Sequence, residues 1–320
     1  MVIRMVKRTD FTVFEICAGA GGQAIGLEQA GFLHMGALDN DPNACATLRA
    51  NREKEWPVLE TDVRLFDGKP LCGTIDLLAG GVPCPPFSVA GRQLGRDDER
   101  DLFPQALRLV EEIKPKAVML ENVRGFKSAK FDSYRTELWV QLHALGYNVV
   151  ADIFDAAEFG VPQYRKRFVL VALRPQYACH FEWPKPCGTF RTVGETLGAE
   201  MQSRGWRGAD PWRVRASRPG PTIVGGSKKH GGADLGPTRA KEAWAKLGID
   251  GMAIALQPPD DMFPMDGLPQ LTNGMVAIIQ GFPRAWRFSG KKTAVYRQIG
   301  NAFPPPMAKA IGLSIIKALR

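Results

Sequence analysis

Short apolar runs alternate with helix-length amphipathic segments up to about residue 174, and this alternation leaves few folds open. The apolar runs predict strands over residues 12–17, 34–38, 75–79, 117–120 and 167–173. The amphipathic segments predict helices over residues 23–30, 42–51, 102–113 and 131–145. Strands that alternate with helices are typical of a parallel sheet covered by helices, so we predict an α/β domain here.

The chain changes character at Pro175. Proline, glycine, tryptophan and arginine become frequent there, which predicts short regular elements and long loops. Helical periodicity returns near Leu271, and Pro304–Leu319 begins with prolines suited to a helix start and continues with apolar residues at helical spacing. We therefore expect two domains, one formed by residues 1–174 with 285–320 and a smaller, loop-rich one formed by residues 175–284.

The charge is uneven between the two parts of the chain. Residues 1–174 hold 22 basic and 23 acidic residues, whereas residues 175–320 hold 20 basic and 10 acidic ones. A basic excess is typical of a domain that binds a polyanion, most often nucleic acid, but it occurs about as often on a solvated surface without a partner.

Hydropathy and cysteine spacing limit the class of protein further. No apolar run approaches the roughly 18–20 residues of a membrane span. The N-terminal residues also lack the apolar stretch of a secretory signal, so we expect a cytoplasmic protein without a membrane partner. The six cysteines lie far apart with no Cys-x-x-Cys pair, so neither a disulfide framework nor a metal site is predicted.

A glycine-rich turn, Ala18–Gly22, falls between the first predicted strand and the first predicted helix. Glycines at such a turn let the backbone approach a ligand closely, and Asp39, at the end of the second strand, is placed to accept both ribose hydroxyls of an adenosine group. The pattern fits nucleotide-like cofactors in general, and a tight strand-to-helix turn without a ligand produces it too.

Cys84 stands between prolines in the loop that follows the strand over residues 75–79. Prolines on both sides exclude it from a helix, so its thiol is expected at the carboxyl end of the sheet, where α/β enzymes place reactive groups. A thiol of pKa ~8.5 is mostly protonated at neutral pH, so we expect a nearby cation or hydrogen-bond donor to assist it. Cys45 and Cys72 lack such surroundings, and we interpret them as core filling.

Three further motifs end or begin predicted elements. Glu121-Asn-Val ends a strand, where a buried carboxylate needs a partner and is otherwise a surface turn residue. Gln163–Arg167 opens the last strand with cations that point either into the same cleft or into solvent. Gln298–Pro304 precedes the terminal helix and, taken alone, is only a turn.

In this order and spacing the five motifs resemble those of the DNA (cytosine-5)-methyltransferases. The resemblance implies that residues 1–174 and 285–320 form a Rossmann-like, S-adenosylmethionine-dependent methyltransferase domain. It also implies that residues 175–284 form a smaller target-recognition domain that binds DNA. The cofactor positions that it implies are Gly19, Gly21, Gly22, Asp39, Asn40, Asp62, Val63, Pro83, Leu102 and Asn301. Cys17 stands where the family usually has phenylalanine, so stacking on the adenine is expected to be weaker.

The resemblance also implies how the reaction proceeds. Cys84 attacks C6 of a cytosine that has been flipped out of the duplex, which lets C5 take the methyl group of S-adenosylmethionine. Glu121 contacts N3 and N4 and stabilises the adduct by proton donation or hydrogen bonding, while Arg167 contacts O2 and Arg165 lies nearer the phosphates. The DNA contacts that we expect are Ser88, Arg92, Arg96, Arg213, Arg215, Arg218, Lys228 and Lys229.

Other classes of protein share parts of this pattern. An RNA cytosine-5 methyltransferase would use the same cysteine and glutamate chemistry, although the large basic segment favours double-stranded DNA. A catalytically inactive DNA-binding relative should have lost Cys84 or Glu121, and a nicotinamide oxidoreductase gives the loop of Cys84 no role. The resemblance further implies a monomer that acts on the nucleoid, separately from any cognate restriction endonuclease. No motif specifies the sequence that is methylated.

Overall fold

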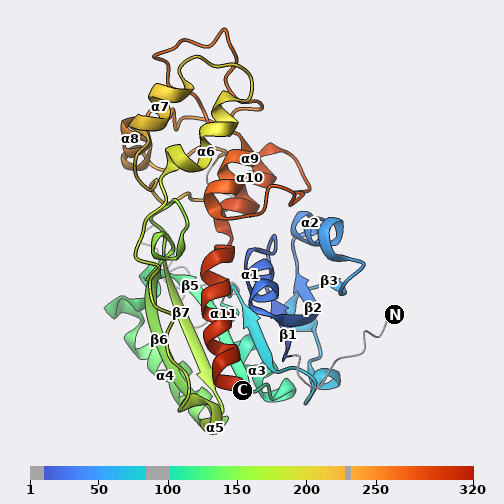
Figure 1. The fold of residues 1–320 in the computed structure, drawn as a ribbon. Coiled ribbons are helices and arrows are strands. Elements are labelled where there is room, and N and C mark those ends of the chain that lie inside the picture. Colours follow the sequence, from blue (N-terminus) through green and yellow to red (C-terminus); the bar gives the residue numbers. More distant parts are fainter. Residues whose placement is uncertain (1–10, 84–100, 228–231) are drawn as a thin grey trace.

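The computed structural model describes residues 11–83, 101–227 and 232–320. Figure 1 shows an α/β lobe with a smaller lobe of short helices and loops beyond one end of its sheet. The strands are β1 (Phe11–Ile16), β2 (Phe32–Asp39), β3 (Val58–Glu60), β4 (Leu77–Gly80), β5 (Ala117–Val123), β6 (Asn148–Asp155) and β7 (Lys166–Leu173). The helices are α1 (Gly22–Ala30), α2 (Pro42–Arg52), α3 (Phe103–Ile113), α4 (Asp132–Ala144), α5 (Pro175–Ala178), α6 (Val193–Gln202), α7 (Ala209–Arg215), α8 (Thr238–Lys246), α9 (Asn273–Gln280), α10 (Lys292–Asn301) and α11 (Pro305–Leu319).

Within the described residues the sheet has seven strands in the order β3-β2-β1-β4-β5-β7-β6. The strands β1 to β5 are parallel, but β7 runs antiparallel to both of its neighbours. The expectation of a parallel sheet is therefore wrong for this last strand. Only residues 156–165 connect β6 to β7, and a connection this short joins adjacent strands that run in opposite directions.

The two faces of the sheet bury different helices because side chains alternate along each strand. On β1, Val13 packs in the cluster formed by α1 and α11, whereas Phe14 and Ile16 pack in the cluster formed by α3 and α4. A Cβ atom at Gly26 would lie 2.4 Å from Cβ of Ala308, so glycine at this position allows α1 and α11 to approach closely. The α/β fold predicted for the first part of the chain is confirmed.

A third apolar cluster lies mainly in the smaller lobe. It contains side chains of the five helices from α6 through α10, with the buried residues Trp206, Trp212 and Trp244 among them. It also includes Ile25 and Leu48 of the larger lobe. Helix α10 belongs to this cluster, although residues 285–320 were expected in the larger domain. The domain boundaries themselves stay a prediction. In the part of the chain that the structure describes, no helix is long and apolar enough to cross a bilayer.

Candidate active site

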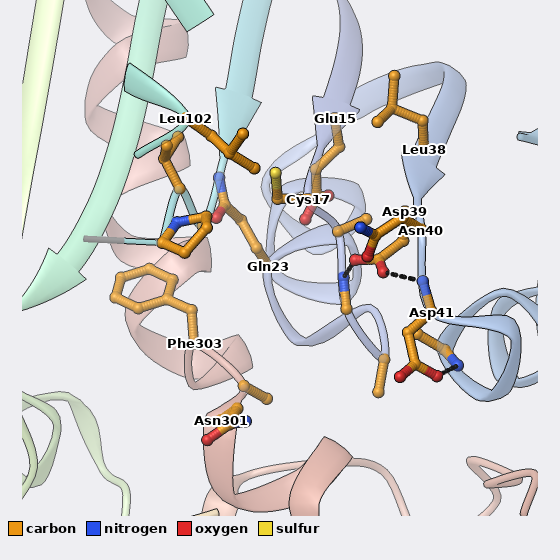
Figure 2. A pocket seen from close by; sticks show the side chains of 18 of the residues that line it. Glu15, Cys17, Gln23, Leu38, Asp39, Asn40, Asp41, Leu102, Asn301 and Phe303 are labelled. Carbon is orange, nitrogen blue, oxygen red and sulfur yellow. Dashed lines mark hydrogen bonds between the residues drawn. The ribbon is translucent and has the colours of Figure 1, made fainter. Parts of the chain in front are cut away.

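A cavity of about 840 Å³ opens where β1, β2, β4 and β5 end, as Figure 2 shows. It has the place expected for a ligand site in a sheet of parallel strands. Its lining includes eight of the predicted cofactor positions, Gly19, Asp39, Asn40, Asp62, Val63, Pro83, Leu102 and Asn301. Glu121 and Arg167 also line it, so most of the predicted cofactor positions and two of the predicted catalytic positions share one cavity.

The glycine-rich turn is held in place by the carboxylate of Asp39. Its Oδ2 accepts a hydrogen bond from the backbone N–H of Gly19 at 2.8 Å, and its Oδ1 accepts one from the N–H of Asp41 at 2.8 Å. Burial raises the pKa of Asp39, while these N–H groups oppose the shift. Gly19 has a φ of +54°, in the left-handed region that glycine adopts at little cost. Asp39 therefore shapes the turn as well as facing the cavity.

Gly21 and Gly22 do not line the cavity. A Cβ atom on Gly21 would lie 2.7 Å from Leu48, and one on Gly22 would lie 2.3 Å from the carbonyl oxygen of Phe303. The structure thus assigns close packing to these two glycines, and the cofactor contact expected of them stays a prediction.

Several titratable groups lie in the wall of this cavity or directly beside it. Burial raises the pKa of Glu15 well above its usual range, and burial lowers the pKa of His34 to about 3. Their side chains lie 3.5 Å apart, and burial thus disfavours the charged form of both groups. Burial also raises the pKa of the Cys17 thiol, whereas the guanidinium of Arg64, 2.6 Å from Asp62, lowers the pKa of that carboxyl.

Glu121 and Arg167 face each other across the strands β5 and β7. Because β7 is antiparallel, it begins at the edge where β5 ends, and Arg167 pairs in register with Val123. The Nε atom of Arg167 lies 2.7 Å from Oε1 of Glu121, and both residues are at least nine-tenths buried. Burial raises the pKa of Glu121, although the charges of Arg167 and Arg165 oppose the shift. The carboxyl group therefore takes up a proton more readily than an exposed glutamate, as a group that donates to a substrate nitrogen should.

Asn122 connects this pair to the loop that leads to Cys84. Its Nδ2 donates to the carbonyl oxygen of Val82 at 2.9 Å, so the end of β5 fixes the chain that precedes Pro83. Cys84 itself, with the predicted DNA contacts Ser88, Arg92 and Arg96, lies outside the described residues, and so do Lys228 and Lys229.

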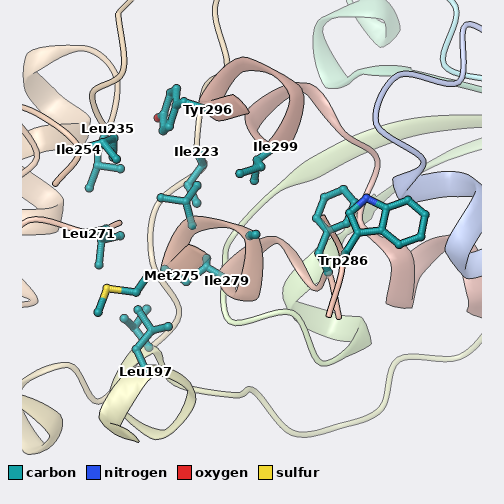
Figure 3. Close-up of a cluster of buried hydrophobic side chains, with 14 of the residues drawn as sticks. Leu197, Ile223, Leu235, Ile254, Leu271, Met275, Ile279, Trp286, Tyr296 and Ile299 are labelled. Atoms are coloured by element: carbon teal, nitrogen blue, oxygen red, sulfur yellow. The ribbon is translucent and has the colours of Figure 1, made fainter. Parts of the chain in front are cut away.

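Arg165 is placed differently from the expectation that it lies near DNA phosphates. It is fully buried and does not line the cavity. Its guanidinium donates to the carbonyl oxygens of Ile223 at 2.7 Å, Gly300 at 2.7 Å and Ala302 at 3.0 Å. These carbonyls lie at the junction of the two lobes, beside the apolar cluster of Ile223 and Ile299 in Figure 3. Three backbone carbonyls thus engage the guanidinium of Arg165 in the described structure, and the phosphate contact expected of it stays a prediction.

Gln163 belongs to the same junction. Its Nε2 donates to Oε1 of Gln280 at 2.7 Å, and its Oε1 accepts from the backbone N–H of Ile223 at 2.7 Å. Gln280 in turn donates to the carbonyl oxygen of Ala302 at 2.7 Å. The motif Gln163–Arg167 thus contributes to two sites. Gln163 and Arg165 connect the two lobes, and Arg167 contacts Glu121 in the cavity.

Three arginines predicted to contact DNA lie in or just after α7. Arg213 and Arg218 are exposed. Arg215 is exposed too, but its Nη2 donates to the carbonyl oxygen of Ala245 at 2.9 Å at the end of α8. Their contact with DNA stays a prediction.

Sequence reasoning missed several cavity residues, among them Glu15, Gln23 and Arg297. An acid inside the apolar run of β1 was a usable signal for Glu15, since a carboxylate is seldom buried without a purpose. Gln23 carried no signal, because a glutamine in a first helical turn is ordinary. The described residues contain no group of three or more histidine, cysteine, aspartate or glutamate side chains placed to hold a metal.

Comparison with known proteins gives a consistent result. The model of the C-5 cytosine-specific DNA methylase family matches residues 11–317. The chain is 54% identical to the type II methyltransferase M.NaeI of Lentzea aerocolonigenes over 312 residues, which cover 96% of this chain and 75% of that protein. It is 50% identical to M.NgoMIV of Neisseria gonorrhoeae over 316 residues, which cover 97% and 99%.

Solved structures with little sequence identity share the fold. A methyltransferase of Entamoeba histolytica matches with a TM-score of 0.68 at 16% identity, over 97% of this chain and 99% of that one. The Dnmt2 methyltransferase of S. pombe matches with a TM-score of 0.62 at 18% identity, over 97% and 98%.

Proposed function

This chain belongs to the family of C-5 cytosine-specific DNA methylases and is a DNA (cytosine-5)-methyltransferase, and from this premise we propose how its residues perform a sequence-specific reaction. The observation that carries the mechanism is the buried pair of Glu121 and Arg167 in the wall of the cavity, next to the chain that leads to Cys84. A glutamate with a raised pKa beside a cation can bind N3 of a pyrimidine and donate a proton there.

The cavity fits S-adenosylmethionine in size and chemistry. About 840 Å³ lies within the usual range for sites of drug-sized molecules and cofactors. Asp39 and Asn40 would hold the ribose, and Asp62 with Val63 would contact the adenine. When bound, this cofactor supplies an electrophilic methyl group on its sulfonium.

We assign the chemical steps to three residues of the chain. Cys84 forms a bond from its sulfur to C6 of the flipped-out cytosine, which makes C5 nucleophilic. Glu121 holds N3 and supplies the proton or hydrogen bond that stabilises the adduct, and Arg167 fixes Glu121 and contacts O2. Loss of the C5 proton after methylation and release of the Cys84 sulfur from C6 then restore the aromatic ring.

DNA recognition is assigned to the smaller lobe. Arg213, Arg215 and Arg218 are among its exposed cations and would contact the DNA, and the segment carrying Ser88, Arg92 and Arg96 would contact the backbone of double-stranded DNA. We propose a monomer that modifies nucleoid DNA in the cytoplasm, separately from any cognate restriction endonuclease.

Two measurements test this function. Bisulfite sequencing of plasmid from an expressing host should show one recurring sequence that contains 5-methylcytosine. Duplex DNA that carries 5-fluorocytosine in that sequence should form a stable adduct, because fluorine replaces the proton that must leave. Methylation of RNA in preference to DNA, or an adduct mapped to a cysteine other than Cys84, would contradict the proposal.

A further inference from the structure

Gln23 is a buried polar residue for which the described structure offers no hydrogen-bond partner. Its side chain is only 3% exposed, and neither Nε2 nor Oε1 forms a hydrogen bond within the protein. A buried amide without partners costs about 1–3 kcal/mol, so native proteins rarely retain one without a reason.

The side chain lines the cavity. Gln23 lies in the first turn of α1, and in Figure 2 it extends into the space between Leu102 and Cys17, with Phe303 nearby. Leu102 and Phe303 offer only apolar side-chain surface to the amide. A bound molecule is therefore the partner that the position calls for.

The surroundings of Gln23 indicate which part of a ligand would bind there. The cap residue of α1 is Gly21, which has no side chain to cap the helix, and the first turn contains no acidic residue. The leading N–H groups of such a helix favour a carboxylate. An amide adds one group that donates and one that accepts, which matches a ligand end carrying both a carboxylate and an ammonium group.

We propose that the side-chain amide of Gln23 binds the amino-acid end of the cofactor and thereby positions the methyl donor. This inference rests on the function proposed above. The ribose and adenine are already assigned to Asp39 and Asp62, which lie at the ends of other strands, so the amino-acid end is the polar part that remains.

The test compares two ligands that differ only at this end. S-adenosylhomocysteine carries the amino-acid chain, whereas 5′-methylthioadenosine has the same nucleoside and thioether with a methyl group in its place. Gln23→Leu keeps nearly the same shape and removes the amide. Binding of both ligands to the full-length protein is measured by calorimetry, in displacement mode for the weaker one.

We expect Gln23→Leu to weaken S-adenosylhomocysteine about tenfold or more, as for a hydrogen bond to a charged group, and to change methylthioadenosine by less than about twofold. The melting temperature of the ligand-free protein should stay equal or rise, because an unpaired buried amide has been removed. The exposed Gln29 of the same helix provides a matched control, and Gln29→Leu should leave both affinities unchanged.

The outcomes separate the two proposals. If the wild-type protein does not bind S-adenosylhomocysteine, the proposed function fails. If it binds, but Gln23→Leu weakens both ligands equally or neither, the function stands and the assignment of Gln23 is overturned.

Discussion

Arg165 offers a direct test of whether the segment just before β7 braces the two lobes or binds DNA. The change is Arg165→Leu, which removes a fully buried guanidinium, takes the donor from the carbonyls of Ile223 and Gly300, and leaves the carbonyl of Ala302 with only its bond from Gln280. Among the described residues no nearby amide is free to replace it, since Gln280 already donates to Ala302 and Gln163 already donates to Gln280. The variant should therefore lose stability.

The magnitude follows from the three bonds. Each hydrogen bond from a charged donor contributes about 1.5–3 kcal/mol, and such contributions are not additive within one network. Burial disfavours the cation, as the lowered pKa of Arg165 shows, so part of the gain is already offset in the wild type. We expect the free energy of unfolding to fall by about 2–4 kcal/mol.

Urea unfolding followed by tryptophan fluorescence measures this loss as a lower midpoint. DNA binding is measured in parallel at several salt concentrations, with Arg218→Leu as the contrasting variant because Arg218 is exposed. Arg218→Leu should change stability by less than about 0.5 kcal/mol and weaken DNA binding. The brace is refuted if Arg165→Leu keeps the wild-type midpoint while its salt slope for DNA falls by about one, as for a lost phosphate contact.

Three further predictions concern the cavity. Cys84→Ser should abolish methylation and leave binding of S-adenosylhomocysteine intact, because a serine hydroxyl is not ionised at neutral pH, and turnover near the wild-type rate in a tritium-transfer assay would contradict the mechanism. Asp39→Ala should weaken both S-adenosylhomocysteine and methylthioadenosine in calorimetry without changing the methylated sequence, and a changed sequence would refute the assignment. Burial raises the pKa of Glu15 in the folded protein. The contribution of its protonated form to stability is therefore fully present below the unfolded pKa and is lost as the pH rises through the folded pKa. Wild-type stability relative to Glu15→Gln should thus decline in urea unfolding as the pH rises above the ordinary glutamate pKa, and parallel pH profiles would contradict this.

The sequence predicted the elements of the larger lobe well because their patterns are local. An apolar run and a glycine turn fix β1 and the start of α1 whatever surrounds them. The direction of β7 is not local, since it depends on the short connection from β6. Strand β6 was missed because it lies at the edge of the sheet and is largely half-exposed, so its residues form no clear apolar run. The other missed strand, β3, has only three residues.

The site shows the same division between local and tertiary information. Arg165 and Arg167 are two residues apart, so strand periodicity would place them on one face. They diverge because β7 begins at Lys166, which leaves Arg165 outside the strand and free to turn toward the junction. The pairing of Arg167 with Glu121 was not predicted, because the two residues are far apart in the chain and meet only where β7 runs antiparallel beside β5.

The packing of α11 against α1 has a consequence for synthesis of the protein on the ribosome. The apolar face of α1 is made early, but its partner helix follows about 275 residues later, which corresponds to roughly 15–60 s of translation at common rates. Until then Leu27 and Ala30 stay without their final cover. We expect a nascent chain that already contains Cys84 and Glu121 to depend on chaperones and to remain inactive, so that the DNA is modified only by chains that have been translated through α11.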